Sequence, residues 1–316
     1  MNIFPTWLRT ALLGIALATA VAAAPGQAAA PPTQTTYATP DEAVAALIDA
    51  LKQNDTTQLR LVFGPGSDQL TNSGDAVADA AARVRFVAAY TEQHALVATG
   101  SDRLTLNVGP DAWPLPIPLV KAGDGWRFDA SAGAQELVNR RIGRNEIAAI
   151  SSMLGYVAAQ KTYYEMTGKA GHAEYAQRII SRPGKHDGLY WPAEETQEQS
   201  PLADFVARAS AEGYPDDLVS EAPTLVRGYL YRILTTQGPE APGGAKSYVV
   251  HGRMVDGFAL VAWPASYGAS GIMTFIVDGD GVVFQRDLGP RTDRIARAMG
   301  RYEPDIHWTR VDVVGP

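Results

Sequence analysis

The sequence predicts a mixed α+β fold in two parts: a helix-then-antiparallel-sheet module, followed by a long helix packed on a second antiparallel sheet. Two observations carry this prediction. Apolar residues recur at helical spacing over residues 40–92 and again over 132–166. Each of these stretches is followed by short apolar runs bounded by Gly, Pro and Asp, at 94–130 and 229–285, which is typical of strands.

The first 30 residues have the pattern of a secretory signal peptide. Arg9 precedes the uncharged run from Ala11 to Ala24, and Ala28 and Ala30 form a small-residue cleavage pattern. We predict cleavage near Ala30 and a mature protein that is periplasmic or secreted. The alternative is a membrane anchor, but the apolar run is shorter than the roughly 20 residues that a spanning helix needs.

The composition excludes several classes of function. The chain has no cysteine, so disulfides, thiolate metal sites, cysteine nucleophiles and lipid attachment to cysteine are excluded. Its formal charge of −7 argues against a nucleic-acid partner, because such proteins normally present a basic face. We expect no stable membrane span in the mature chain, and the oligomeric state stays open.

Residues 31–38 are predicted to be a flexible leader, and residues 39–131 the first module. Thr39 and Pro40 are typical of a helix start, as N-cap and first helical residue. Further helices are predicted over Thr56–Val62 and Asp75–Glu92. Four strands should follow, at His94–Thr99, Arg103–Val108, Leu115–Lys121 and Trp126–Ala130.

Two details define the predicted sheet. Asp124-Gly125 is a strong hairpin signal between the last two strands. Pro114, Pro116 and Pro118 lack an N–H group, so their strand should be an edge or carry a bulge. Helices followed by a sheet that ends in G-W-R-F-D resemble the cone-shaped, cystatin-like family typified by nuclear transport factor 2.

Residues 132–316 form the predicted second module. An amphipathic helix is expected over 132–166 and a shorter one over 201–213, with a loop over Ser181–Ser200 that Leu189-Tyr190-Trp191 anchors. A short helix over Thr292–Met299 and an irregular end should close the chain. The predicted strands are Tyr229–Thr235, Ser247–His251, Phe258–Trp263, Ile272–Val277 and Val282–Gln285.

Two resemblances cover larger parts of the chain. W-P-L-P-I-P-L-V-K from Trp113, N-R-R-I-G-R-N-E from Asn139 and G-F-A-L-V-A-W-P-A-S-Y-G from Gly257 together resemble a bacterial exported family known as domain of unknown function 2950, over about residues 38–312. That family implies export but no established activity. The second half also resembles the C-terminal domain of type IV pilins and pseudopilins, although the membrane-spanning filament-core segment is missing.

Several motifs that invite a chemical interpretation fit a structural role better. Gly238 to Ser247 lacks the Lys placement of a phosphate loop and is predicted to be a connection between strands. Asp278 to Gly281 lacks the ligands of a calcium loop and predicts a hairpin turn. Ser270 is not in a nucleophile elbow and is predicted to be a turn residue. The five histidines show no zinc spacing, so we expect no metal and no cofactor.

The densest charged motif is the candidate binding site: Arg140, Arg141 and Arg144, followed by Glu146. Arginine makes bidentate contacts with carboxylates and phosphates. Three interpretations stay open: a clamp between the two modules, a solvated helix start with ion pairs, or a ligand site. A second candidate is an aromatic recognition surface of Tyr190, Trp191, Trp263 and Tyr267, against the alternative that these residues pack in the core.

The favoured function is a non-enzymatic binding or assembly module of the cell envelope, with an envelope protein as the expected partner. An alternative is a small-ligand carrier that uses the N-terminal cone as a cavity. A third hypothesis is a hydrolase that combines acids such as Asp129, Glu136 and Glu146. The catalytic residues of such an enzyme are not identified by any motif.

Overall fold

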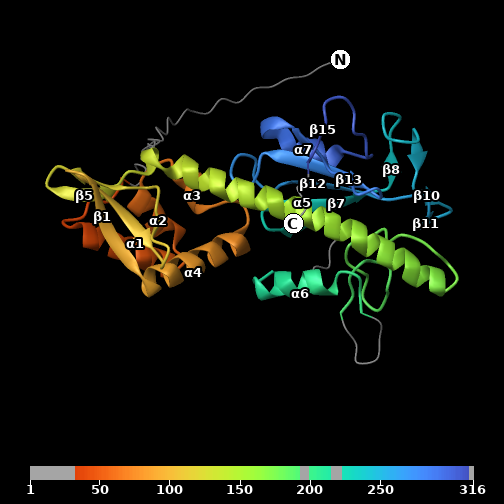
Figure 1. The fold of residues 1–316 in the computed structure, drawn as a ribbon, viewed down its shortest axis with the longest axis horizontal. Coiled ribbons are helices and arrows are strands. Elements are labelled where there is room, and N and C mark those ends of the chain that lie inside the picture. Colours follow the sequence, from red (N-terminus) through yellow and green to blue (C-terminus); the bar gives the residue numbers. More distant parts are fainter. Residues whose placement is uncertain (1–32, 193–198, 215–222, 313–316) are drawn as a thin grey trace, which may run out of the picture. The chain divides into compact units, whose positions relative to one another are not determined.

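In the described part of the protein, the sheets are all antiparallel and alternate along the chain with helices, which confirms the mixed α+β class (Figure 1). The computed structural model describes residues 33–192, 199–214 and 223–312. The predicted signal peptide and its cleavage site near Ala30 lie outside the described residues. No helix in these ranges has both the length and the apolarity needed to span a membrane.

The first helices begin at the caps that the sequence provides. Helix α1 (Pro40–Lys52) has Thr39 as its N-cap, and the Thr39 hydroxyl accepts from the Glu42 N–H at 3.2 Å. Asp55 caps α2 (Thr56–Phe63), and Asp75 caps α4 (Ala76–Glu92). A short helix that the sequence did not predict, α3 (Asp68–Thr71), lies between them.

The first sheet has the strand order β1-β2-β4-β5, with β3 paired to β2. The predicted strand Leu115–Lys121 is only partly confirmed: its last three residues lie in β4, whereas residues 115–118 are not in a strand because Pro116 and Pro118 cannot donate to a ladder. The strands are β1 (His94–Gly100), β2 (Arg103–Val108), β3 (Trp113–Pro114), β4 (Leu119–Ala122) and β5 (Gly125–Phe128).

We call residues 40–128 the N-terminal module, because they hold a hydrophobic core of their own. Helices α1 and α2 pack on β5, and Leu47, Phe63, Leu106 and Phe128 are buried between helices and sheet. Residues of the predicted leader contact this module: the Gln34 side-chain amide donates to the Phe128 carbonyl at 2.6 Å. Tyr37 forms a bridge with Trp126 in β5.

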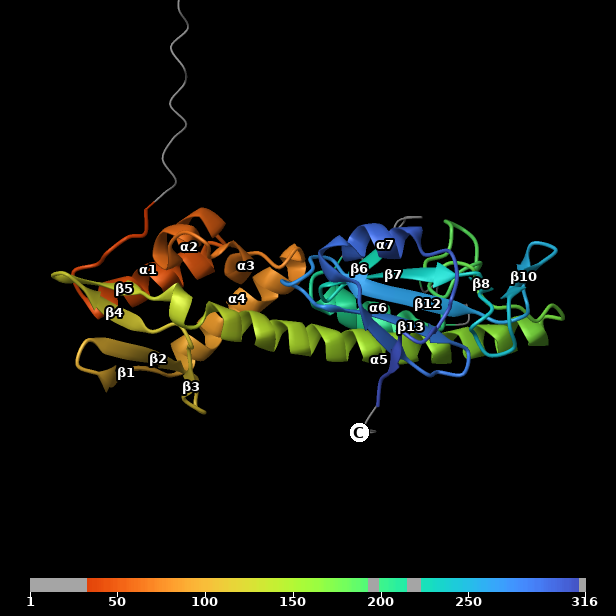
Figure 2. The same cartoon turned by 90° about the horizontal axis from the view of Figure 1, so that it is seen from above.

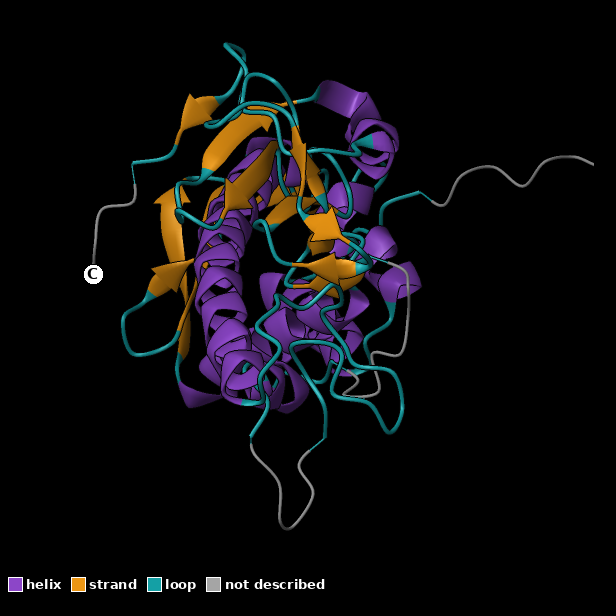
Figure 3. Ribbon diagram, turned by 90° about the vertical axis from the view of Figure 1, so that its right-hand side faces the viewer, coloured by secondary structure: helices purple, strands orange, loops and turns teal. Residues whose placement is uncertain are grey.

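Helix α5 (Ala134–Lys169) follows the 3₁₀ turn η1 (Ala130–Ala132) and takes part in both hydrophobic cores. Leu137 packs on the core of the N-terminal module, whereas Met153 and Tyr156 are buried in the second core. The helix contacts α3 near its start and strands β12 and β13 further on (Figure 2). Figure 3 shows the long helix beside the strands. One continuous helix therefore carries side chains to both cores.

The second sheet has the order β15-β14-β13-β12-β7-β6. Its last strand corrects the predicted irregular end, because Thr309–Arg310 pairs with β14. The Tyr231 and Phe275 backbones flank Ala262 in the register of the central strands. The strands are β6 (Thr224–Val226), β7 (Tyr229–Leu234), β12 (Ala259–Pro264), β13 (Met273–Asp278), β14 (Phe284–Asp287) and β15 (Thr309–Arg310).

Helices cover the two faces of this sheet. Helix α5 packs on one face, and α7 (Thr292–Ala298), which follows η2 (Gly289–Arg291), contacts β12 from the other (Figure 2). Every residue of β12 is buried as a result, which explains its continuous apolar sequence. Helix α6 (Ala203–Ala211) adds Ala209 to the same core, and Phe205 packs against it. We call residues 134–310 the C-terminal module.

Two small hairpins complete the C-terminal module. Strands β8 (Thr236–Gln237) and β9 (Lys246–Ser247) flank residues 238–245, which confirms the predicted connection between strands. The predicted strand Ser247–His251 is divided, because the Ser247 hydroxyl bonds the backbone of Val249 and turns the chain. The second hairpin pairs β10 (Val249–Val250) with β11 (Arg253–Met254).

The two modules belong to one compact unit, residues 32–316. The boundary predicted between residues 131 and 132 stays a prediction, as do the cystatin-like and pilin-like arrangements. The start of α5 follows the N-terminal module directly in the sequence and packs on its core. The candidate site lies at this junction.

Candidate functional site

A cavity of about 220 Å³ opens where the helices of the N-terminal module meet the first turns of α5. Side chains from α1, α2, α3, α4 and α5 and from β3 line it. Most of the wall is apolar, with Leu47, Leu51, Leu59, Phe63, Phe86 and Leu115 among the lining residues. The cavity is open to solvent on one side, and its volume exceeds that of an engineered enclosed cavity of about 150 Å³ that binds benzene, so a small apolar group fits inside it.

Helix α4 is the reason that the cavity exists. None of its 17 residues is buried, although Phe86, Ala89 and Tyr90 pack partly against the core. The residues of α4 that line the cavity include the half-buried Ala78 and the exposed Ala82, whose methyl groups are too short to fill the space beside the helix. The sequence A-V-A-D-A-A-A-R at the start of α4 thus forms a helix but leaves the module incompletely packed.

The polar part of the wall is cationic. Arg83, Arg85, Arg141 and Arg144 line the cavity together with one carboxylate, Asp79. Arg83 is held by the Asn54 side chain and the Thr71 carbonyl. Arg141 lies 3.9 Å from Asp79, and burial lowers its pKa while Asp79 raises it.

The other two arginines have no such partner. Among residues 33–192, 199–214 and 223–312, neither Arg85 nor Arg144 makes a hydrogen bond or an ion pair. Partial burial lowers the pKa of Arg144, and the positive charges of Arg85 and Arg140 lower it further. We call Arg85 and Arg144 the arginine pair.

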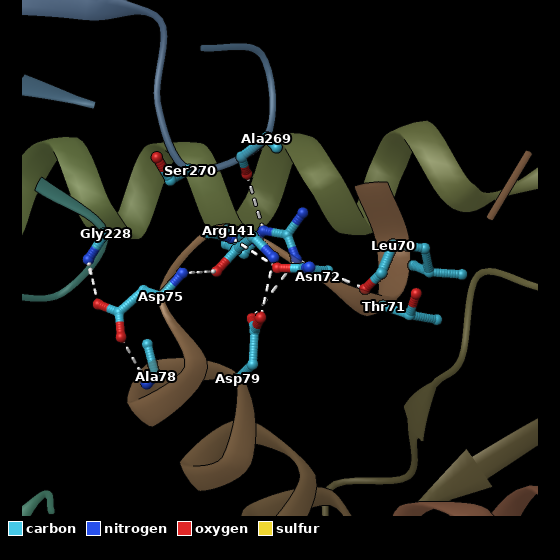
Figure 4. Close-up of polar contacts among 12 residues, drawn as sticks. Leu70, Thr71, Asn72, Asp75, Ala78, Asp79, Arg141, Gly228, Ala269 and Ser270 are labelled. Atoms are coloured by element: carbon cyan, nitrogen blue, oxygen red, sulfur yellow. Dashed lines mark hydrogen bonds and ion pairs between the residues drawn. The ribbon is translucent and has the colours of Figure 1, made fainter. Parts of the chain in front are cut away.

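Arg141 joins the cavity wall to the C-terminal module (Figure 4). Its Nε donates to the Ala269 carbonyl at 2.9 Å, and its terminal nitrogens donate to the carbonyls of Gln69 and Leu70. Ala269 lies in the β12–β13 loop, residues 265–272, whereas Gln69 and Leu70 belong to α3. A single guanidinium group therefore connects α5, α3 and this loop, which fits the clamp interpretation of the sequence.

Neighbouring residues of α5 bind the same loop. The Asn145 side-chain amide donates to the Ser270 carbonyl at 2.9 Å. Glu146 Oε1 accepts from the backbone N–H groups of Ile272 and Met273 at 2.9 and 3.0 Å. Ser270 is buried and its hydroxyl bonds the Ser266 backbone, which confirms its predicted role in a turn.

Asp75 makes a second connection between the modules. Its fully buried carboxylate caps α4 through the Ala78 N–H at 3.0 Å and also accepts from the Tyr214 hydroxyl and the Gly228 N–H, both at 2.6 Å. Burial and the Asp75 carboxylate raise the pKa of Tyr214. Gly228 has a φ of +78°, and a Cβ there would lie 2.5 Å from Asn145 Nδ2, so only glycine fits.

The three arginines of the sequence motif have three different environments. Arg140 pairs with Glu136 at 2.7 Å and lies over the Trp113 ring at 5.4 Å. Arg141 is the connection described above, and Arg144 is exposed at the cavity. On α5, Arg140 thus forms a solvated ion pair, Arg141 connects the modules, and Arg144 has no hydrogen-bond or ion-pair partner among the described residues.

The four aromatic candidates occupy positions in or beside the second core. Trp263 is fully buried and donates to Asp293 at 3.0 Å, and Trp191 is buried and stacks on His186. Tyr190 packs partly against the same core. The Tyr267 hydroxyl donates to Asp287 at 3.2 Å. This burial of both tryptophans fits core packing, and the recognition surface stays a prediction.

Other parts of the described chain offer weaker sites. A cavity of about 680 Å³ in the C-terminal module is lined by Arg182 and Arg253 among others, but these pair with Asp187 and Glu174. No cluster of three or more His, Asp or Glu side chains that could hold a metal ion is present in residues 33–192, 199–214 and 223–312.

Sequence reasoning missed half of this site. Arg85 and Asp79 lie on the predicted helix of Asp75–Glu92, but nothing in its spacing distinguished them from a solvated face. Asp75 was identified only as the start of a helix, although an N-cap is also compatible with longer-range bonds. The close run of arginines at 140–144 was the one signal that led to the cavity.

The fold and site define an α+β protein with two hydrophobic cores, a long shared helix and an apolar cavity with a cationic wall. A family model described as "Protein of unknown function (DUF2950)" matches residues 34–311. The chain belongs to this family. No curated protein and no solved structure matches the chain.

Proposed function

We propose that the chain is an exported, non-catalytic binding protein that holds a small apolar ligand in the cavity of its N-terminal module. The observation that carries this proposal is the 220 Å³ cavity beneath α4. Filling such a space would stabilise the fold, and proteins keep unfilled apolar space where function requires it. The carrier hypothesis from the sequence expected a pocket enclosed by the sheet of residues 40–130, whereas this cavity is lined mainly by helices, α5 among them.

The carboxylates of the hydrolase hypothesis support a structural role instead. Glu136 is paired with Arg140, and Glu146 accepts from two backbone N–H groups. The two residues are ten positions apart on α5, which at 1.5 Å per residue separates them by roughly 15 Å along the helix. Asp129 accepts from the Ser131 hydroxyl at 2.5 Å. These contacts do not favour a cooperating acid pair.

Export remains part of the proposal and rests on the N-terminal sequence. The charge of −7 and the absence of cysteine fit an envelope protein that depends on its cores for stability. N-terminal sequencing of the native protein should give a start near Pro31. A start at Met1 would refute export without affecting the proposed binding site.

The binding proposal is tested with a neutral apolar probe and two matched variants. Titration calorimetry with 1-hexanol should show saturable binding to the wild-type protein and raise its melting temperature, because a ligand of the native state stabilises it. Ala82→Leu, whose larger side chain enters the cavity, should abolish this binding. Ala88→Leu makes the same change at an exposed position of α4 outside the cavity lining and should bind as the wild type does.

Absence of hexanol binding to the wild-type protein would refute the proposal. Equal binding by the Ala82→Leu variant would place the ligand elsewhere and refute the assignment to this cavity.

A further inference from the structure

The charge of the cavity wall is unusual for this chain. The whole sequence carries 34 acidic against 27 basic side chains, yet the wall carries four arginines and one aspartate. Opposite charges in contact stabilise each other. If the charges of this acidic protein were distributed evenly over its surface, carboxylates would lie beside these arginines. The wall therefore has a net positive charge, whereas the whole chain has a net negative charge.

The positive charge of two of these arginines is not used by the fold. Arg83 and Arg141 are bound by side-chain and backbone oxygens, as described above. In the described ranges Arg85 and Arg144 are bound by none. Like charges beside each other are unfavourable unless an anion joins them, and the positive charges of Arg85 and Arg140 lower the pKa of Arg144. The carboxylate whose pKa the charge of Arg85 lowers, Glu212, is already bound to Arg227.

The arginine pair and the apolar wall bound the same space. Arg85 is one residue before Phe86 on α4, and both side chains line the cavity. Arg144 is seven residues, or about two turns, after Leu137 on α5, which also lines it. An occupant of the cavity would thus meet aliphatic and aromatic side chains at one part of its surface and guanidinium groups at another.

Guanidinium groups select the chemistry of that second part. Arginine presents planar donors that match the oxygens of a carboxylate or a phosphate, and such charge-assisted bonds are roughly twice as strong as neutral ones. A cationic headgroup would be repelled, and a neutral one would leave the like charges of the pair uncompensated.

We infer that the ligand is a small amphiphilic anion, with its apolar body in the cavity and a carboxylate or phosphate group on Arg85 and Arg144. This inference rests on the proposed binding function and names its ligand class. The cavity is somewhat larger than an engineered cavity of about 150 Å³ that binds benzene. A short alkyl chain or a substituted phenyl group is therefore the apolar body that fits inside it.

The inference is tested by calorimetric titration of the purified chain with compounds that contain a chain of six carbon atoms and differ in the terminal group: hexanoate, hexyl phosphate, 1-hexanol and hexylammonium. Hexanoate or hexyl phosphate should bind about tenfold more tightly than 1-hexanol, as expected when a hydrogen bond to a charged group is gained. Hexylammonium should bind more weakly than 1-hexanol. Acetate, which has the charge without the tail, should bind at least about tenfold more weakly than hexanoate.

Variants locate the headgroup. The double variant Arg85→Ala/Arg144→Ala should lose the preference for the anions over 1-hexanol, and its circular dichroism spectrum should report an intact fold. Arg103→Ala removes an equally charged, exposed side chain on β2 that does not line the cavity, and it should keep the full preference. The relative affinity of hexanoate and hexyl phosphate identifies which oxyanion the pair fits better.

Three results would overturn the inference: equal affinity for hexanoate and 1-hexanol, acetate binding as tightly as hexanoate, or an unchanged anion preference in the double variant. Each of these leaves hexanol binding in place, so the proposed apolar-ligand function would survive. Failure of every six-carbon compound, 1-hexanol included, would instead refute the proposed function itself.

Discussion

The two modules of this protein are packed to different degrees. In the C-terminal module, β12 lies between α5 and α7, and all six of its residues are buried. In the N-terminal module, the 17-residue helix α4 has no buried residue and borders a cavity of about 220 Å³. The same chain thus contains one core that is covered on both faces and one that keeps open space.

This difference in packing suits the two modules to different roles, with stability provided by the C-terminal module and ligand binding by the N-terminal module. Dense packing in the C-terminal module provides contacts that a protein without disulfides needs. The N-terminal module instead leaves apolar wall and unpaired cations available to a ligand. Arg141, Asn145 and Asp75 connect the two, so that the loosely packed helix α4 is held at its N-terminus by the C-terminal module.

The largest expected difference between the modules comes from truncating one tryptophan in each. Trp263→Ala should lower the free energy of unfolding by about 3–5 kcal/mol, because Trp263 is fully buried and bonded to Asp293. Trp113→Ala, at a half-buried residue beside the cavity, should cost less than about 2 kcal/mol. Urea denaturation of both variants measures this. Equal losses would show that the N-terminal core is packed as tightly as the other.

Removing the connection at Asp75 should have the next largest effect. Asp75→Ala leaves the Tyr214 hydroxyl and the Gly228 and Ala78 N–H groups without their acceptor, at a cost of about 3 kcal/mol. Hydrogen exchange should show the loss concentrated at the start of α4. The control is Asp68→Ala, which removes an exposed ion pair with Arg60 and should cost less than about 1 kcal/mol. If Asp75→Ala left the free energy of unfolding unchanged, the contacts assigned to the Asp75 carboxylate would be contradicted.

The same change, Ala→Leu, should alter the free energy of unfolding in opposite directions in the two modules. Ala82→Leu places methyl groups into the cavity and should raise the free energy of unfolding by about 0.5–1 kcal/mol. Ala262→Leu, at a fully buried position of β12, should lower it by about 1–3 kcal/mol through overpacking. Thermal unfolding monitored by circular dichroism distinguishes them. Destabilisation by both changes would mean that the space beneath α4 cannot accept a side chain.

The smallest effect is a pH dependence that arises where α6 meets β6. The Arg227 guanidinium bonds both oxygens of Glu212 and lowers its pKa, with smaller contributions from the charges of Arg85 and Arg208 and partial opposition from burial. A carboxyl with a lowered pKa in the folded state stabilises the protein above its unfolded pKa of 4.5 and loses this contribution as the pH falls through the folded value.

Glu212→Gln should therefore be less stable than the wild type at pH above about 5, by less than about 1 kcal/mol because the pair is about one-third exposed. The two proteins should become equally stable in stronger acid. Urea midpoints measured across this pH range test the sign, and a difference that grows toward low pH would show that another group causes the dependence.

Much of the secondary structure followed from local sequence. Thr39 and Pro40 start α1, Asp75 starts α4 and the strand at Arg103–Val108 has the predicted bounds. Errors arose where a side chain or a distant strand decided the backbone. The Ser247 hydroxyl turned the chain within a predicted strand, and β14 recruited Thr309–Arg310 into a strand that no local pattern indicated.

By itself, the sequence determined the helix starts, the alternation of helices and antiparallel strands, and the presence of an arginine-rich turn at residues 140–144, because caps, periodicity and composition act over a few residues. Only the tertiary structure decided which arginines connect parts of the fold and which have no bonding partner. Arg141 meets carbonyls that lie 128 and about 70 residues away, whereas Arg85 and Arg144 line an apolar space without a hydrogen bond or an ion pair in the described residues. Such contacts depend on how separate elements pack, and that information is not contained in the spacing of any single segment.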